Sequence, residues 1–163
     1  MHIFTRAVTV LSAALALAAC LGTGISSSAK PNDTYIPASQ QIICEKVGEK
    51  YSICPELLEA MIERESSGQT NVSNGACIGL MQVNRKYHTK RMQELGYQNL
   101  WDEQANIETG ASLLADLCEK YEDVGVALMA YNGTKHPEER TELTKYAQGI
   151  LDRSEELERI HGK

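Results

Sequence analysis

The chain has 163 residues, of which 42% are hydrophobic and 23% are charged, and its formal net charge is −6 at pH 7. This length and balance fit one globular domain once a targeting segment is set aside. An acidic chain has no general attraction for the phosphates of nucleic acids or for anionic lipids. We therefore exclude nucleic-acid binding as a function class.

The first segment, residues 1–20, has the features of an export signal. Arg6 supplies a positive start, and an uncharged stretch rich in alanine and leucine follows. The stretch has the length of a signal-peptide core and is too short to span a bilayer. It ends in LAAC at residues 17–20, which resembles the lipobox of bacterial lipoproteins, so we expect Cys20 to be lipidated. Ordinary cleavage after Ala29 and an uncleaved anchor are the alternatives.

Between residues 21 and 39 the composition shifts to Gly, Ser, Thr, Pro and Asn. This composition is typical of a flexible tether. We expect it to join the anchor to a folded domain over residues 40–163. The protein is then expected in the cell envelope, in contact with the membrane only through the lipid at Cys20, or else secreted.

The expected domain contains four cysteines, Cys44, Cys54, Cys77 and Cys118. An even number in an exported protein favours a disulfide, but four cysteines allow three pairings and the sequence does not choose among them. The alternative is that some are small buried apolar residues, as the position of Cys118 on an apolar helix face suggests. There is no CxxC or HExxH spacing, so we expect no metal and no cofactor.

Beyond the linker the chain has almost no strand signal, so we expect a mainly α fold. Apolar residues at helical spacing predict helices over residues 40–50, 55–65, 103–121 and 124–131, and a last helix that begins near Pro137. In the first helix, Ile42, Ile43 and Val47 should face inward. Residues 68–76 are rich in Gly, Asn and Ser and indicate a loop. The apolar run 78–83 is either a strand-like piece or a helix start.

The second predicted helix carries a glutamate on its apolar face. At about 100° per residue, Glu65 projects between Met61 and Leu58. The other glutamates gather on the opposite side, where we expect solvent: Glu56, Glu59 and Glu63. Burial of a carboxylate among aliphatic groups raises its pKa, and an acid that keeps its proton toward neutral pH can protonate a leaving glycosidic oxygen. The alternative is a frayed helix end that leaves Glu65 in solvent.

Short motifs follow Glu65 in a characteristic order. They are Glu65-Ser66, Gly79-Leu80-Met81-Gln82, Asn106-Ile107 with Gly110, Ala130-Tyr131-Asn132, and Tyr146. Each motif alone is weak. In this order and spacing they resemble the lytic transglycosylase domain of the soluble-transglycosylase (SLT) type, glycoside hydrolase family 23, over residues 40–151.

The resemblance implies a lysozyme-like helical fold with a groove for peptidoglycan. It implies that Glu65, as the single general acid/base, cleaves the MurNAc-GlcNAc β-1,4 bond and that attack by the muramyl 6-hydroxyl gives 1,6-anhydro ends. By position it also implies residues that bind substrate or orient the acid: Ser66, Met81, Gln82, Tyr131, Asn132 and Tyr146. Plain packing is the alternative for Met81 and Tyr146, and a helix cap is the alternative for Asn132.

The stretch from Arg64 to His88 also resembles goose-type lysozyme, a hydrolase of the same superfamily. An inverting hydrolase needs a second carboxylate to activate water, and residues 66–93 contain no Asp or Glu. The remaining candidates would have to be brought in by the fold: Asp102, Glu103 and Glu108. We therefore favour the lytic transglycosylase and keep the hydrolase as the alternative.

Two further function classes are weaker. A cysteine peptidase would pair Cys77 with His88 or His136, but no peptidase signature surrounds Cys77. A non-catalytic peptidoglycan-binding protein would keep the fold, but an intact Glu65 argues against it. We expect a monomer that acts on glycan strands, in wall turnover, in phage entry, or beside a secretion or conjugation apparatus.

Overall fold

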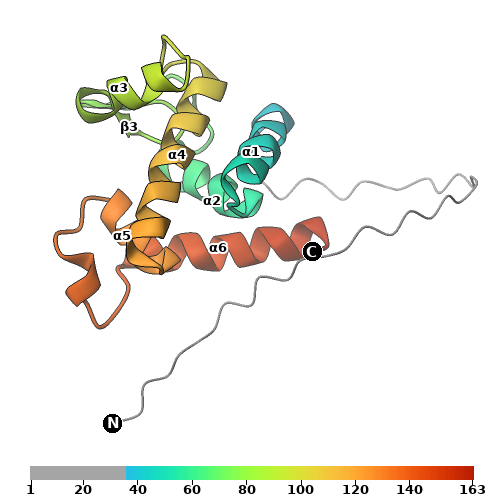
Figure 1. The fold of residues 1–163 in the computed structure, drawn as a ribbon. Helices are drawn as coiled ribbons and strands as arrows, with labels where there is room; N and C mark the ends of the chain where they lie inside the picture. Colours follow the sequence, from blue (N-terminus) through green and yellow to red (C-terminus); the bar gives the residue numbers. More distant parts are fainter. Residues whose placement is uncertain (1–35) are drawn as a thin grey trace, which may run out of the picture. The chain divides into compact units, whose positions relative to one another are not determined.

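The computed structural model describes residues 36–163. The expectations for residues 1–35, which include the export signal and lipidation of Cys20, lie outside the described residues. The elements along the chain are α1 (Ala38–Tyr51), α2 (Pro55–Ser66), β1 (Ser73–Asn74), β2 (Cys77–Ile78), β3 (Val83–Asn84), α3 (Arg85–Glu94), α4 (Glu103–Tyr121), α5 (Val124–Tyr131), the 3-10 turn η1 (Pro137–Glu139) and α6 (Lys145–His161) (Figure 1). The expected mainly α class is confirmed. Within this part of the chain, none of the helices combines the length and the apolar character that a membrane span requires.

Side-chain caps explain where several helices begin. Asp102 accepts a hydrogen bond from the Ala105 amide and starts α4, and Asp123 accepts one from the Val126 amide and starts α5. Such caps satisfy amides that have no partner within the helix. The predicted ranges 103–121 and 124–131 agree with the observed helices.

The predicted start of the last helix and the predicted inward face of α1 are wrong. The last helix does not begin near Pro137, which starts only a three-residue turn; α6 begins at Lys145, after Thr144 accepts a hydrogen bond from the Ala147 amide. Ile42 does not face inward, since half of its surface is exposed. In α1 the buried positions are instead Gln40, Cys44, Val47 and Gly48.

The core lies where α1, α2, α4, α5 and α6 meet. Helix α2 packs between α1 and α6, and α4 packs against α1 and α5 (Figure 1). The largest fully buried apolar side chains come from these helices and from the turn between β2 and β3: Leu58, Met61, Ile62, Leu80, Met81, Ile107, Leu114, Leu128, Met129, Ile150 and Leu157. Burial of such side chains contributes about 1.5–3 kcal/mol each.

The polar face of α2 is covered by α6, contrary to the expectation that it faces solvent. Glu56 and Glu59 are each only 1% exposed. The Arg153 guanidinium donates to Glu63 at 2.7 Å, and the His161 ring lies 2.9 Å from Glu56. Glu56 at the start of α2 meets His161 at the end of α6, and Glu63 further along α2 meets Arg153 further back in α6. The two helices therefore run antiparallel. Helical spacing alone does not show which neighbour covers a face.

The expected disulfide is not formed. The four cysteines of residues 36–163 are free thiols that lie on different elements: Cys44 in α1, Cys54 before α2, Cys77 in β2 and Cys118 in α4. Cys44 is fully buried, and burial raises the pKa of its thiol. It acts as a small apolar core residue, which was the alternative that the sequence left open.

Candidate active site

Glu65 lies in the last turn of α2, and its carboxyl group is held by a tyrosine from α6. The Tyr146 hydroxyl donates to Glu65 Oε1 at 2.5 Å. The helix continues to Ser66, so it does not fray before Glu65. Burial raises the pKa of Glu65, and the hydrogen bond from Tyr146 and the charge of Arg64 only partly oppose this rise. Burial thus shifts the Glu65 carboxyl group toward its protonated form.

Two tyrosines near this carboxyl group remain protonated. Burial, and then the negative charge of Glu65, raise the pKa of both Tyr131 and Tyr146. Tyr146 uses its proton for Glu65, whereas Tyr131 donates to the carbonyl oxygen of Met81 at 2.9 Å. One tyrosine therefore orients the acid, and the other attaches the β2–β3 turn to the same region.

The β2–β3 turn is fixed to α4 by a buried asparagine. The Asn106 amide donates to the carbonyl oxygens of Ile78, at 3.0 Å, and Leu100, at 2.7 Å, and it accepts from the Met81 amide at 2.8 Å. Gly79 has a positive φ of 75°, and a Cβ there would lie 2.2 Å from Asn106 Nδ2. The Gly79 and Asn106 motifs therefore form one structural unit.

Gly110 lets the turn approach α4 closely. A Cβ at this position would lie 2.7 Å from the sulfur of Met81 and 3.0 Å from the hydroxyl of Tyr131. Any larger residue would push both groups away, since real Cβ atoms do not make contacts under 3.0 Å. The glycine thus preserves the bond between Tyr131 and the turn.

The other residues named from the sequence make the following contacts within the fold. The Ser66 hydroxyl donates to the Ile62 carbonyl, and the Met81 side chain is fully buried. The Gln82 amide donates within its own loop, to the carbonyl oxygens of Val72 and Gly79. The remaining residue, Asn132, is the exposed C-cap of α5. Of the six, the structure brings Tyr146 into direct contact with Glu65.

The carboxylates proposed for water activation are engaged in other bonds. Asp102 caps α4. Glu103 accepts from Thr70 at 2.8 Å. Glu108 is bound by Lys50; burial alone would raise the pKa of Glu108, but this bond and others lower it. Each of the three therefore has a structural role of its own.

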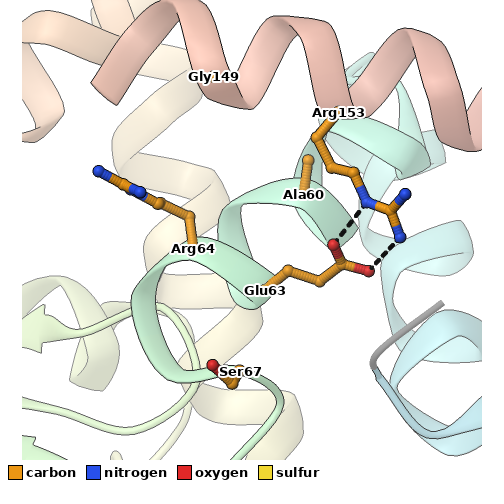
Figure 2. Close-up of a pocket in the computed structure, with 6 residues that line it drawn as sticks. All are labelled: Ala60, Glu63, Arg64, Ser67, Gly149 and Arg153. Atoms are coloured by element: carbon orange, nitrogen blue, oxygen red, sulfur yellow. Dashed lines mark hydrogen bonds and ion pairs between the residues drawn. The ribbon is translucent and has the colours of Figure 1, made fainter. Parts of the chain in front are cut away.

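A cavity of about 370 Å³ lies between α2 and α6, and Glu65 is not among the residues that line it. It is lined by Ala60, Glu63, Arg64, Ser67, Gly149 and Arg153 (Figure 2). In Figure 2 the paired Glu63 and Arg153 lie on one side, and the exposed Arg64 lies on the other. The Arg64 guanidinium is 5.8 Å from the centre of the Tyr146 ring. From the sequence, Arg64 was noted only as the start of the stretch that resembles goose-type lysozyme, and Arg153 was not singled out.

The fold and this site define a class: a lysozyme-like helical domain that holds one partly buried glutamic acid against a tyrosine. The family model described as "Transglycosylase SLT domain" matches residues 43–153. The chain belongs to this transglycosylase SLT domain family. The expected enzyme class, a lytic transglycosylase, is confirmed.

Individual proteins agree with this assignment. Protein IpgF of Shigella flexneri is 33% identical over 128 residues, which cover 73% of this chain and 84% of that protein. A transglycosylase of Enterobacteria phage PRD1 is 35% identical over 85 residues, which cover 52% of this chain and 31% of the phage protein.

The solved structure of an inactive mutant of lytic transglycosylase Slt from Pseudomonas aeruginosa superposes with a TM-score of 0.66 at 15% identity. The match covers 78% of this chain and 25% of that chain. At this identity the likeness shows the fold alone.

Proposed function

We propose that the protein cleaves the β-1,4 bond between MurNAc and GlcNAc in peptidoglycan, with Glu65 as the single general acid and base. The observation that carries the proposal is the partly buried Glu65 carboxyl group under the Tyr146 hydroxyl. A carboxylic acid whose pKa is raised by burial keeps its proton toward neutral pH and can donate it to the glycosidic oxygen.

In the proposed reaction Glu65 acts twice. Its proton passes to the leaving oxygen of the glycosidic bond as that bond breaks. The resulting carboxylate then accepts the proton of the muramyl 6-hydroxyl, whose oxygen bonds to the anomeric carbon and closes a 1,6-anhydro ring. The hydrogen bond from Tyr146 stabilises the carboxylate between the two steps, because a donor favours the charged form of an acid.

The absence of acidic residues between residues 66 and 93 supports this route over hydrolysis. An inverting hydrolase needs a second carboxylate several ångströms from the acid to activate water. The three carboxylates considered for water activation serve as a helix cap or are bound to other side chains: Asp102, Glu103 and Glu108. The phage relative that is named a transglycosylase adds to this support.

We also propose that the protein is exported and anchored through a lipid at Cys20, as the LAAC sequence at residues 17–20 indicates. A monomer on a lipid tether would reach glycan strands near the membrane, alone or beside a secretion or conjugation apparatus. Membrane fractionation of cells that express wild type or Cys20→Ser tests the anchor: the variant should leave the membrane fraction. Equal membrane retention of both would disprove it.

Product analysis tests the reaction. Purified cell walls are digested with the protein, with Glu65→Gln as the blank, and the soluble muropeptides are analysed by mass spectrometry. We expect anhydromuramyl ends, which lack the mass of one water relative to reducing ends. Reducing ends alone would establish the hydrolase, and no soluble product would favour a binding protein.

A further inference from the structure

A second cluster of ionisable side chains lies at the other end of the α2–α6 pair. Glu56 and Glu59 project from the first turns of α2, and His161 comes from the last turn of α6. One potential ligand atom from each lies within 4.8 Å of the others. Both glutamates are buried, and the histidine side chain is 23% exposed. The family assignment gives this cluster no role, and the proposed reaction does not use it.

One oxygen of this cluster has no partner. Glu59 Oε2 is buried and makes no hydrogen bond, although buried polar atoms are nearly always bonded. The neighbouring Glu56 has the same charge, three residues earlier on the same helix face. Two buried carboxylates with an unsatisfied oxygen between two helices are the environment that a cation stabilises.

One of the groups bonded to Glu56 can be displaced by such a cation. His161 Nδ1 lies 2.9 Å from Glu56 Oε1, and Lys163 Nζ lies 2.7 Å from the same oxygen. The Lys163 side chain is 53% exposed, so its ammonium group can move into solvent. The Cys54 thiol donates to the other oxygen of Glu56 at 3.0 Å, which places a soft sulfur next to the carboxylates.

We propose that Glu56, Glu59 and His161 form a binding site for a zinc ion. Imidazole and carboxylate are ligands that zinc accepts, usually with four ligands in a tetrahedron. Neighbouring ligand atoms in such a tetrahedron lie about 3.3 Å apart. The three atoms all lie within 4.8 Å of one another, so small changes of the side-chain torsions would bring them to this spacing. A water molecule would supply the fourth ligand.

No sequence motif indicates this site, because the residues are far apart in the chain. Glu56 and His161 are separated by 105 residues, and only the antiparallel packing of α2 on α6 brings them together. A bound zinc ion would join the start of α2 to the end of α6. The acid and its tyrosine lie at the opposite ends of both helices, so the ion serves stability and not the cleavage step.

Thermal unfolding of the full-length protein tests the proposal. The chain is purified with EDTA, dialysed, and heated with or without zinc chloride in a buffer that contains a non-chelating reductant. We expect the Tm to rise on the order of 10 °C at zinc hundredfold above Kd. Magnesium and calcium at the same concentration should leave it unchanged, since an imidazole does not suit these ions.

A matched pair of histidine variants identifies the site. His136 forms a comparable cluster with Glu138 and Glu139, but all three are exposed. His161→Ala should lose the zinc response, and His136→Ala should keep it. A response that survives His161→Ala, or a wild type that shows no response, overturns the proposal.

Glu59→Gln keeps the test decisive if His161→Ala unfolds. Its amide removes a buried charge without a change of shape, so the metal-free protein should stay folded. Titration calorimetry with zinc chloride should show one site per chain in wild type and at least tenfold weaker binding in Glu59→Gln. Equal affinity in both proteins contradicts the proposal as well.

Discussion

The two ends of the α2–α6 pair both bury a carboxylate, and they treat its charge in opposite ways. At one end, burial tends to raise the pKa of Glu56, but hydrogen bonds from Cys54, Lys163 and His161 lower it to about 2. At the other end, burial prevails and the pKa of Glu65 stays raised despite Tyr146 and Arg64. The charge of Glu56 is thus compensated by its partners. The charge of Glu65 is compensated only in part, which favours the proton that the proposed reaction needs.

This difference has opposite consequences for stability as the pH changes. Because the pKa of Glu56 is lowered by folding, its stabilisation is present above its usual pKa of 4.5 and is lost as the pH falls toward 2. Folding raises the pKa of Glu65. Its contribution to folding stability is therefore complete below pH 4.5 and is lost as the pH rises through the higher pKa of the folded state. At neutral pH the first group stabilises the fold and the second weakens it.

The largest effect is expected for Glu65→Gln. Loss of the only acid should reduce the release of soluble muropeptides roughly a thousandfold or more. The same change should raise the Tm by a few degrees at pH 7, because a neutral amide removes the cost of the buried charge, and this gain should vanish near pH 4. Calorimetry at the two pH values measures it. Glu119→Gln, an exposed change on α4, is the control, and a lower Tm for Glu65→Gln at pH 7 would contradict the comparison.

The next largest effect concerns the ion pair midway along the two helices. Arg153→Met removes the bidentate bond that the guanidinium makes with the Glu63 side chain, which is 9% exposed. The free energy of unfolding should fall by about 2 kcal/mol, below the usual cost of a broken buried pair because the Arg153 side chain is itself 18% exposed. Urea denaturation followed by circular dichroism measures the change. Arg159→Met, an exposed arginine of the same helix, should change it by less than about 0.5 kcal/mol.

Tyr146→Phe tests how the acid is oriented. Removal of the hydroxyl takes away the hydrogen bond that stabilises the ionised form, so the pKa of Glu65 should rise further and the alkaline limb of the activity profile should move to higher pH. Activity at pH 7 should fall roughly tenfold, because the carboxyl group loses its fixed orientation. Tyr131→Phe is the control: its hydroxyl bonds the Met81 carbonyl, so activity should fall without a shift of the limb.

The smallest effect is expected for Arg64→Gln. The exposed guanidinium lowers the pKa of Glu65 only in part, and solvent screens exposed charges. The alkaline limb should move slightly upward, and activity at pH 7 should change less than about threefold. Parallel pH profiles of Arg64→Gln and of Arg85→Gln, an exposed arginine of α3, provide the comparison. A tenfold loss confined to Arg64→Gln would show that this residue binds substrate directly.

The sequence predicted the fold best where helix signals are local. α4 and α5 were predicted to the residue from apolar residues at helical spacing, and the structure adds a capping aspartate at the start of each. α3 was missed because its ten residues are almost all polar and only Met92 is buried. The polar face of α2 was misjudged because its partner α6 lies about ninety residues away in the chain.

For the candidate site, the position of Glu65 on an apolar face followed from helical spacing. The role of Asn106 did not, because its three hydrogen bonds join segments that spacing cannot bring together. The bond between Tyr146 and Glu65 likewise spans 81 residues. Only the resemblance to a known family had indicated that these two side chains act at one place.

The Gln82 side chain stabilises the left-handed backbone conformation that Gln82 itself adopts in its loop. Its φ of 47° is left-handed, which costs a residue with a side chain roughly 1–2 kcal/mol, and its amide offsets that cost by donating to the Val72 and Gly79 carbonyls. A glutamate at this position would set a negative charge against both carbonyl oxygens, and an alanine would leave them with one donor fewer. A substitution at position 82 therefore loses this compensation unless a second change in the loop restores a donor.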